Sequence, residues 1–140
     1  MKVVSGDLWK IEVDYKGITT NGYVTKNGNA VMGRGVALQA KQMFPGIEVE
    51  LGRSIILTGN HIHFLSKNLF SFPVKHNWWE KADLNLIKQS VQELKDTALI
   101  YTKYTFAIPL PGTGNGRLTP EEVWPLLTEL PDNVIVVIKE

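Results

Sequence analysis

The segment Gly28–Lys41, with the letters GNAVMGRGVALQAK, joins a glycine-rich turn to the start of an amphipathic pattern. Glycine adopts backbone angles that other residues avoid, and it lets backbone N–H groups approach an anion closely. The first turn of a helix adds unpaired N–H donors and a partial positive charge. This order of residues predicts a cradle for a diphosphate group.

A second glycine-rich segment, Pro111–Leu118 with the letters PGTGNGRL, also precedes a predicted helix. Two such loops indicate one nucleotide-like ligand held from both sides. An ordinary tight turn is the alternative for either loop taken alone. Neither loop ends in the Gly-Lys-Ser/Thr sequence of a nucleoside-triphosphate P-loop, and no Ser/His/Asp set lies at recognisable turns.

The rest of the chain alternates between strand-like and helix-like patterns, which is typical of an α/β fold with a mixed sheet covered by helices. The run Val134–Ile138 is apolar throughout, as expected for a strand buried on both faces. Including that run, the strands predicted from β-branched and apolar segments cover residues 3–4, 9–13, 17–22, 54–57, 61–65, 68–72, 104–108 and 134–138.

Three helices are predicted. The first covers Gly35–Phe44 and stops before a Pro-Gly pair. Asp83 is the predicted N-cap of a long second helix, and Thr119 begins the third with a proline at its first position and a capping-box glutamate. The apolar stripe of the second helix consists of Leu84, Ile87, Val91, Leu94 and Ala98. Both glycine loops then fall at strand-to-helix turns, where ligands bind in such sheets.

The composition narrows the class of protein. The length of 140 residues suits one domain over residues 1–140. With 15 Lys+Arg and 14 Asp+Glu, the net charge of +1 gives no strong attraction to bulk nucleic acid or to a membrane surface. The absence of cysteine and the presence of only 3 histidines argue against a zinc site, so no metal is expected. Without a signal sequence or a bilayer-spanning run, a cytoplasmic monomer is the expectation.

Several motifs occur in the order and rough spacing found in macrodomains, the modules that bind ADP-ribose. The chain resembles that family at Gly6-Asp7-Leu8, Thr20-Asn21-Gly22, residues 31–37 (VMGRGVA) and residues 112–116 (GTGNG). It is similar in particular to the branch with the terminal ADP-ribose protein glycohydrolases and the DNA ADP-ribosyl glycohydrolase antitoxins, which also share residues 72–78 (FPVKHNW). The resemblance covers nearly the whole chain. It implies a three-layer α/β/α sandwich with a mixed central sheet that binds ADP-ribose and needs no cofactor.

The resemblance also implies the ligand contacts. Asp7, beside the Leu8 backbone, would accept a hydrogen bond from the adenine amino group, and Asn21 would lie near the distal ribose. The alternative for both Asp7 and Asn21 is that they only shape their turns. The Arg34 side chain either binds phosphate or points to solvent. The diphosphate and the distal ribose would be held by Met32, Gly33, Arg34, Gly35, Val36, Ala37, Pro111, Gly112, Thr113, Gly114, Asn115, Gly116, Arg117 and Leu118.

Lys75 is the candidate catalytic residue. In hydrolases of that branch the matching lysine attacks the anomeric carbon of the distal ribose and forms an intermediate that water resolves. A nucleophilic lysine must be neutral part of the time, which requires desolvation or a nearby positive charge. A solvated surface lysine is the alternative. His76 is expected at the surface, and one of Trp78 and Trp79 is expected to pack under the following helix, although an exposed indole could stack on a nucleobase.

One position departs from the protein glycohydrolases, which pair their lysine with an aspartate where this chain has Gly116. Its Gly-Asn-Gly pattern resembles the DNA branch instead. The expected function is therefore removal of ADP-ribose from a modified macromolecule, with DNA favoured over protein, by a stand-alone bacterial or phage domain. The alternatives are a non-catalytic ADP-ribose reader and a phosphatase acting on ADP-ribose 1''-phosphate.

Overall fold

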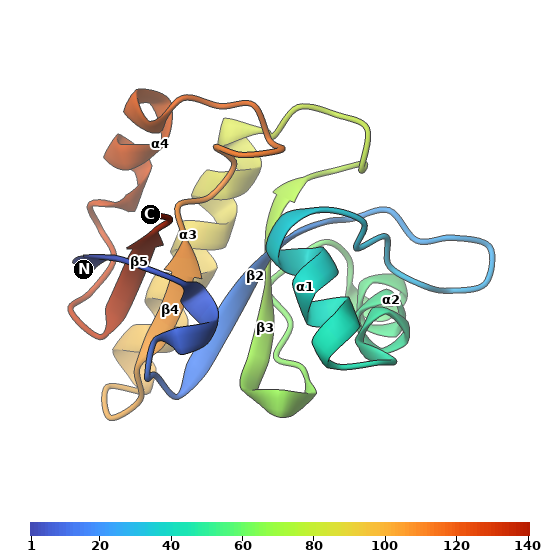
Figure 1. Cartoon of the computed structure of the whole chain (residues 1–140), viewed down its shortest axis with the longest axis horizontal. Coiled ribbons are helices and arrows are strands. Elements are labelled where there is room, and N and C mark those ends of the chain that lie inside the picture. The colour runs from blue at the N-terminus through green and yellow to red at the C-terminus, as the bar shows by residue number, and fades with distance from the viewer.

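Five strands form one sheet at the centre of the computed structural model, which describes residues 1–140 (Figure 1). The strands lie in the order β1-β5-β4-β2-β3, and every neighbouring pair runs parallel. Parallel strands need crossover connections, which here carry the helices. The strands are β1 (Lys2–Ser5), β2 (Tyr15–Asn21), β3 (Leu69–Lys75), β4 (Phe106–Pro109) and β5 (Val134–Ile138).

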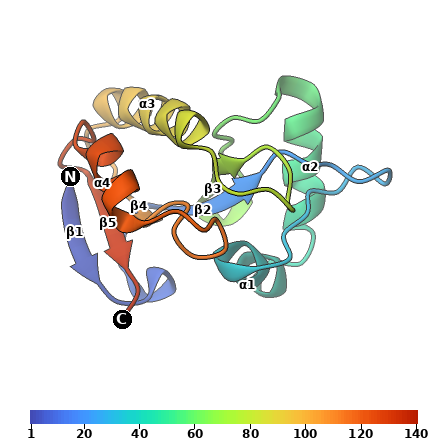
Figure 2. The same cartoon turned by 90° about the horizontal axis from the view of Figure 1, so that it is seen from above.

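Helices cover both faces of the sheet, which makes the three-layer α/β/α sandwich that the resemblance implied. On one face, α3 and α4 bury their apolar stripes against β3, β4 and β5 in the largest core cluster. On the other face lie α1, α2 and the 3₁₀ turn η1 (Figure 2). The helical elements are η1 (Leu8–Lys10), α1 (Gly35–Met43), α2 (Ile47–Thr58), η2 (Ser66–Asn68), α3 (Leu84–Ile100) and α4 (Pro120–Leu127).

The expected mixed sheet is wrong, because all strand pairs are parallel and antiparallel pairing is limited to two isolated bridges. The strand predicted at residues 54–57 is instead the last part of α2. Ile47, Leu51 and Ile55 recur every four residues and are buried, so the helical period outweighs the short β-branched run. Residues 61–65 contribute only the bridge of Phe64 to Phe70.

A strand was also predicted at residues 9–13, and this prediction is wrong as well. The Asp7 carboxylate accepts a hydrogen bond from the Trp9 backbone N–H at 3.0 Å and caps η1. That local bond tightens the chain into a helical turn where the apolar residues had indicated a strand.

The predicted helix starts are confirmed. Asp83 caps α3 by accepting from the Asn85 N–H at 2.8 Å. Thr119 and Glu122 form the reciprocal capping box of α4, with Pro120 at its first position. None of the helices has the length and apolar content needed to cross a membrane. Histidine, aspartate and glutamate side chains form no group of three or more that could hold a metal ion.

Candidate functional site

The carboxyl ends of the parallel strands share one edge of the sheet, and Figure 2 looks down on that edge. There β2 ends at Asn21, β3 ends at Lys75 and β4 leads into the loop that contains residues 111–118. The start of α1, in blue-green, lies beside this orange loop (Figure 2). Segments far apart in the sequence are therefore brought together, as expected at the ligand-binding edge of an open parallel sheet.

The first glycine loop leads directly into α1. Met32 is buried in the core and anchors the loop, whereas Gly33 and Gly35 are exposed. Arg34 occupies the N-cap position of α1, and no side chain caps the helix. The first-turn N–H groups, among them that of Val36, thus have no intrahelical acceptor. This is the donor array and the partial positive charge that an anionic group requires.

The second glycine loop is folded tightly on itself. Gly112 and Arg117 have positive φ angles of 77° and 64°. The Leu118 N–H donates to the Gly112 carbonyl at 2.9 Å, and the Arg117 N–H donates to the Gly114 carbonyl at 3.0 Å. A Cβ atom at Gly116 would lie 2.4 Å from the Gly112 carbonyl oxygen. The loop therefore has no room for a side chain at position 116, where the protein glycohydrolases place their aspartate.

The two glycine loops and the candidate nucleophile lie together. The Asn115 amide nitrogen would be 3.4 Å from a Cβ atom at Gly35, so its side chain lies against the first loop. The Asn115 carbonyl oxygen accepts a hydrogen bond from Lys75 Nζ at 3.1 Å. Lys75 Nζ also donates to the Trp78 carbonyl at 3.4 Å. The end of β3 thus points its amine toward the region where both loops offer backbone donors.

The environment of Lys75 favours the neutral amine. Partial burial lowers the pKa of Lys75 below its usual value of 10.5, and the positive charges of Arg117 and Arg34 lower it further. A lowered pKa is the property that a nucleophilic lysine needs. The two carbonyl acceptors work in the opposite direction, since they hydrogen-bond the ammonium form.

The backbone of Lys75 is fixed by residues that the sequence did not reveal as part of the site. Asn60 Nδ2 donates to the Lys75 carbonyl at 3.0 Å, and the Gly22 N–H donates to the same carbonyl at 3.1 Å. Asn60 lies between the strands predicted at residues 54–57 and 61–65, and no role in the site was expected for it. No local pattern could have found it, because it reaches Lys75 only through the fold.

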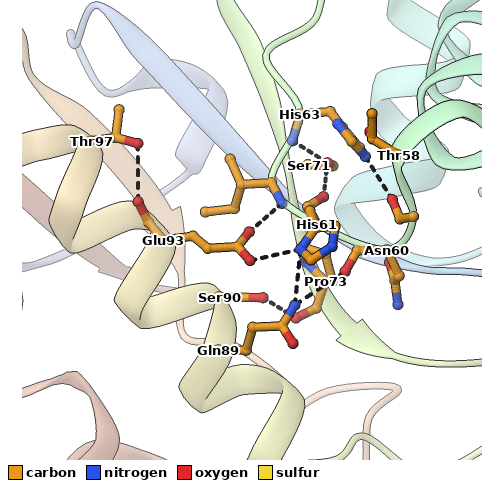
Figure 3. Close-up of polar contacts among 12 residues, drawn as sticks. Thr58, Asn60, His61, His63, Ser71, Pro73, Gln89, Ser90, Glu93 and Thr97 are labelled. Atoms are coloured by element: carbon orange, nitrogen blue, oxygen red, sulfur yellow. Dashed lines mark hydrogen bonds and ion pairs between the residues drawn. The ribbon is translucent and has the colours of Figure 1, made fainter.

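Asn60 itself is part of a polar network between α3 and the segment before β3 (Figure 3). Gln89 Nε2 donates to the Asn60 carbonyl at 3.3 Å and lies 3.2 Å from His61 Nδ1. His61 Nδ1 in turn lies 2.8 Å from a carboxylate oxygen of Glu93. On the same helix, Ser90 Oγ donates to the Pro73 carbonyl at 2.7 Å. Side chains of α3 thus fix the end of β3, directly through Ser90 and indirectly through Gln89 and Asn60.

Asp7 and Leu8, the predicted adenine contacts, follow β1 on the face that carries α1. One Asp7 oxygen accepts from the Trp9 N–H. Leu8 is buried in a small cluster against which Val36 of α1 also packs. The segment therefore lies next to the start of α1, while β5, β4 and β2 separate β1 from the strand of Lys75. A ligand that contacts both Asp7 and Lys75 must span most of the sheet edge.

Asn21, the predicted ribose contact, already has partners at both ends of its amide. Its Nδ2 donates to the Val31 carbonyl at 3.0 Å, and its Oδ1 accepts from the Tyr23 N–H at 3.0 Å. These bonds tie the end of β2 to the first glycine loop. Asn21 thus supports the first glycine loop through these hydrogen bonds, and a contact of Asn21 with ribose stays a prediction.

The loop after Lys75 differs from expectation in its tryptophans. Neither packs under α3: Trp78 is 51% exposed and Trp79 is 55% exposed. His76 is exposed, as predicted, and its Nε2 lies 2.8 Å from an Asp83 carboxylate oxygen. That hydrogen bond is the main reason why the pKa of Asp83 is lowered.

The parallel sheet, its helical layers and the glycine loops at one edge define the class of protein: the chain has the macrodomain fold. The macrodomain of Thermus aquaticus DarG matches it with a TM-score of 0.76 and 25% identity, covering 99% of this chain and 97% of its own. The macrodomain of Mycobacterium tuberculosis DarG matches with a TM-score of 0.75 and 25% identity over 98% and 96%. Thermosipho africanus DarTG, solved in complex with ADP-ribose, matches in fold with a TM-score of 0.78 at 18% identity, over 98% of this chain and 41% of that one.

Two sequence relatives carry the name DNA ADP-ribosyl glycohydrolase. The Thermus aquaticus protein is 28% identical over 110 residues, which cover 71% of this chain and 30% of the relative. The Mycobacterium tuberculosis protein is 28% identical over 130 residues, which cover 85% and 35%. The chain thus spans between 30% and 35% of the length of these relatives. No family model matches it.

Proposed function

We propose that this chain is a single macrodomain that binds ADP-ribose and removes it from a modified macromolecule, with Lys75 as the nucleophile. One observation carries the proposal: a lysine with a lowered pKa ends β3 and donates to the Asn115 carbonyl of a glycine loop that lies against the start of α1. A nucleophile with reduced proton affinity beside an anion cradle suits attack on a sugar linked to a diphosphate.

The binding contacts follow from the free donors and acceptors. Backbone N–H groups at the start of α1 and in the second glycine loop would hold the diphosphate. The second carboxylate oxygen of Asp7 has no partner and would accept from the adenine amino group. The distal ribose would then extend along the sheet edge toward Lys75. No metal or cofactor is part of this proposal.

The proposed reaction balances through two displacements at the anomeric carbon of the distal ribose. The neutral Lys75 amine forms a bond to this carbon while the bond to the acceptor breaks, and the acceptor leaves with the electron pair and takes up a proton. Water then attacks the same carbon. The bond to Lys75 breaks, which restores the amine and releases ADP-ribose with a hydroxyl at that carbon.

DNA-linked ADP-ribose is the favoured substrate, for two reasons. The sequence relatives carry DNA ADP-ribosyl glycohydrolase as their name. In addition, the crowding around Gly116 leaves no room for the aspartate that pairs with the lysine in the protein glycohydrolases. A route that relies on Lys75 without that carboxylate agrees with both observations.

A non-catalytic ADP-ribose reader is the second candidate. It is favoured by one observation, namely that the Lys75 amine already donates to the carbonyls of Asn115 and Trp78. These acceptors stabilise the ammonium form, which binds anions well but attacks nothing.

The test is release of free ADP-ribose from ADP-ribosylated DNA and from ADP-ribosylated protein. Wild type should release it, faster from DNA, and Lys75→Ala should reduce release to background. Lys88→Ala, an exposed lysine on α3, serves as the matched control and should keep wild-type activity. Binding of ADP-ribose without release would favour the reader, and phosphate release from ADP-ribose 1''-phosphate would favour the phosphatase.

A further inference from the structure

Three aromatic side chains lie together beside Lys75, and we call Tyr23, Trp78 and Trp79 the aromatic ledge. Trp78 and Trp79 are 51% and 55% exposed, although tryptophan is normally well buried. Trp78 and Trp79 are neighbours of the nucleophile, since Lys75 Nζ donates to the Trp78 carbonyl at 3.4 Å. The proposed hydrolase chemistry does not use any of the three rings.

The rings of the ledge touch one another edge to face, which leaves ring surface open. The Trp78 and Trp79 centroids are 5.4 Å apart with planes at 89°. Tyr23 and Trp79 are also 5.4 Å apart, at 68°. In an edge-to-face pair, only one face of one ring is covered by its neighbour. At least one indole therefore keeps a free face that a flat partner can stack on.

The loop that carries the tryptophans is tied down at both ends. It follows directly from β3, and at this near end the Gly22 N–H donates to the His76 carbonyl at 3.1 Å. Within the loop, the Glu80 N–H donates to the Asn77 carbonyl at 3.2 Å. At the far end, the Ala82 N–H donates to the Gly116 carbonyl at 3.0 Å and the Asp83 N–H donates to the Val74 carbonyl at 2.9 Å. These bonds join the loop to β3 and to the second glycine loop. The ledge is thus held at a set position relative to the site.

We propose that the aromatic ledge stacks against the nucleobases next to the modified base of a single-stranded acceptor. This inference rests on the proposed function and adds residues that position its substrate. Every nucleobase offers a flat π face, and exposed aromatic residues beside cationic groups are the usual platform for single strands. The nearby cations suit the phosphates of such a strand, because the positive charges of Arg117 and Arg34 lie close enough to Lys75 to lower its pKa.

A single strand fits this geometry better than a duplex or a folded protein. Bases in a duplex are stacked on each other and hide their faces, whereas an unpaired base can turn out toward an indole. The linkage to be cleaved would then reach Lys75 while the adjacent base rests on Trp78 or Trp79. The ledge would read the presence of a strand and not its sequence.

The first experiment measures binding of an unmodified single-stranded oligonucleotide by quenching of tryptophan fluorescence. Wild type should be quenched. The double variant Trp78→Ala/Trp79→Ala lacks these fluorophores, so its binding is read by competition against wild type, and it should bind about tenfold more weakly or worse, given the usual strength of base–aromatic stacking. Trp78→Phe/Trp79→Phe should retain most of the binding, which is read by competition. Tyr101→Ala, an exposed aromatic after α3, is the matched control.

The second experiment compares an ADP-ribosylated oligonucleotide with an ADP-ribosylated mononucleoside, and it includes an ADP-ribosylated peptide as a third substrate. The double alanine variant should raise KM for the oligonucleotide about tenfold and leave the mononucleoside and the affinity for free ADP-ribose unchanged. Equal losses on both substrates, or no loss on either, would overturn the ledge proposal. A loss confined to an ADP-ribosylated peptide would overturn it in favour of a protein partner. If wild type releases nothing, the hydrolase proposal fails, but the quenching experiment still decides the ledge.

Discussion

At the scale of single residues, the chemistry depends on the protonation of Lys75. Partial burial and the charges of Arg117 and Arg34 lower its pKa, while the carbonyls of Asn115 and Trp78 hold the ammonium form. The net shift is downward from 10.5. More of the amine is therefore neutral near physiological pH than in a solvated lysine, and the arginines link phosphate binding to the reactivity of the nucleophile.

The first prediction concerns pH. Turnover at saturating substrate should rise with pH as Lys75 loses its proton, with a midpoint below the usual lysine pKa of 10.5. Removing a nearby positive charge makes the proton easier to hold, so Arg117→Gln should raise the pKa and move the rising limb to higher pH. Rates measured across a pH series would test this. Arg53 is an exposed arginine of α2, so Arg53→Gln should leave the pH of the rising limb unchanged. A rising limb at the same pH in wild type and Arg117→Gln would contradict the proposed effect of Arg117 on Lys75.

A second prediction tests the crowding of the second glycine loop. Gly116→Ala places a Cβ atom 2.4 Å from the Gly112 carbonyl oxygen, so it should lower the free energy of unfolding by about 1–3 kcal/mol, as overpacking usually does. A Cβ atom at Gly114 meets nothing within 4 Å, so Gly114→Ala is the matched control and should fold with nearly wild-type stability. Urea denaturation of both variants would measure the difference. Equal stability of the two variants would show that the loop can accommodate a methyl group at position 116.

At the scale of elements, the position of the nucleophile depends on how β2, β3 and α3 are joined. The register between β2 and β3 shifts at Thr20 and Asn21, so that Asn21 pairs with Lys75. Just beyond, the Lys75 carbonyl accepts from both Gly22 and Asn60, and Asn60 is connected to α3 through Gln89. The end of the strand is thus held more firmly than a free strand terminus.

This joint predicts a non-additive pair of substitutions. A Cβ atom at Gly22 would lie 2.6 Å from Asn60 Nδ2, so Gly22→Ala alone should be destabilising. Asn60→Ala alone removes one hydrogen bond to the Lys75 carbonyl and should cost about 1 kcal/mol. Because Asn60→Ala also removes the two atoms nearest the added methyl group, the double variant should lose less stability than the sum. Additive losses in a denaturation cycle would contradict this packing.

At the scale of the whole molecule, the parallel topology gathers the site. Since every strand runs the same way, the segments after β1, β2, β3 and β4 meet at one edge. The opposite edge keeps the turns that enter the strands. A ligand at the functional edge would contact the segment after β1, both glycine loops and the end of β3 together, which couples its binding to the stability of the entire fold.

The link between ligand binding and fold stability predicts that ADP-ribose stabilises the protein against unfolding. ADP-ribose at a hundred times its dissociation constant should raise the free energy of unfolding by about 2.7 kcal/mol, because it binds only the folded state. Thermal unfolding with increasing ADP-ribose would measure the effect. AMP, which lacks the diphosphate and the distal ribose, is the control and should stabilise much less at equal concentration. An unfolding temperature that stays constant would argue against the proposed ligand.

The sequence by itself determined the elements with strong local signals. The caps at Asp83 and Thr119 and the start of α1 after the first glycine loop depend on residues within one helical turn, so they could be predicted. Motif order also pointed to the three-layer macrodomain fold. The sequence-based prediction was wrong at α2, where a short β-branched run indicated a strand. The apolar residues of α2 are spaced as in a helix, and their shared face is recognisable only once it packs in the core.

Only the tertiary structure decided how the site is held and exposed. The bonds of Asn60 and Gly22 to Lys75, the contact of Asn115 with the first loop and the parallel sense of the sheet join residues distant in the chain. The exposure of Trp78 and Trp79 likewise depends on a loop fixed by bonds to β3 and to the second glycine loop. Local residue types carry no record of such contacts, because each one exists only after the chain has folded.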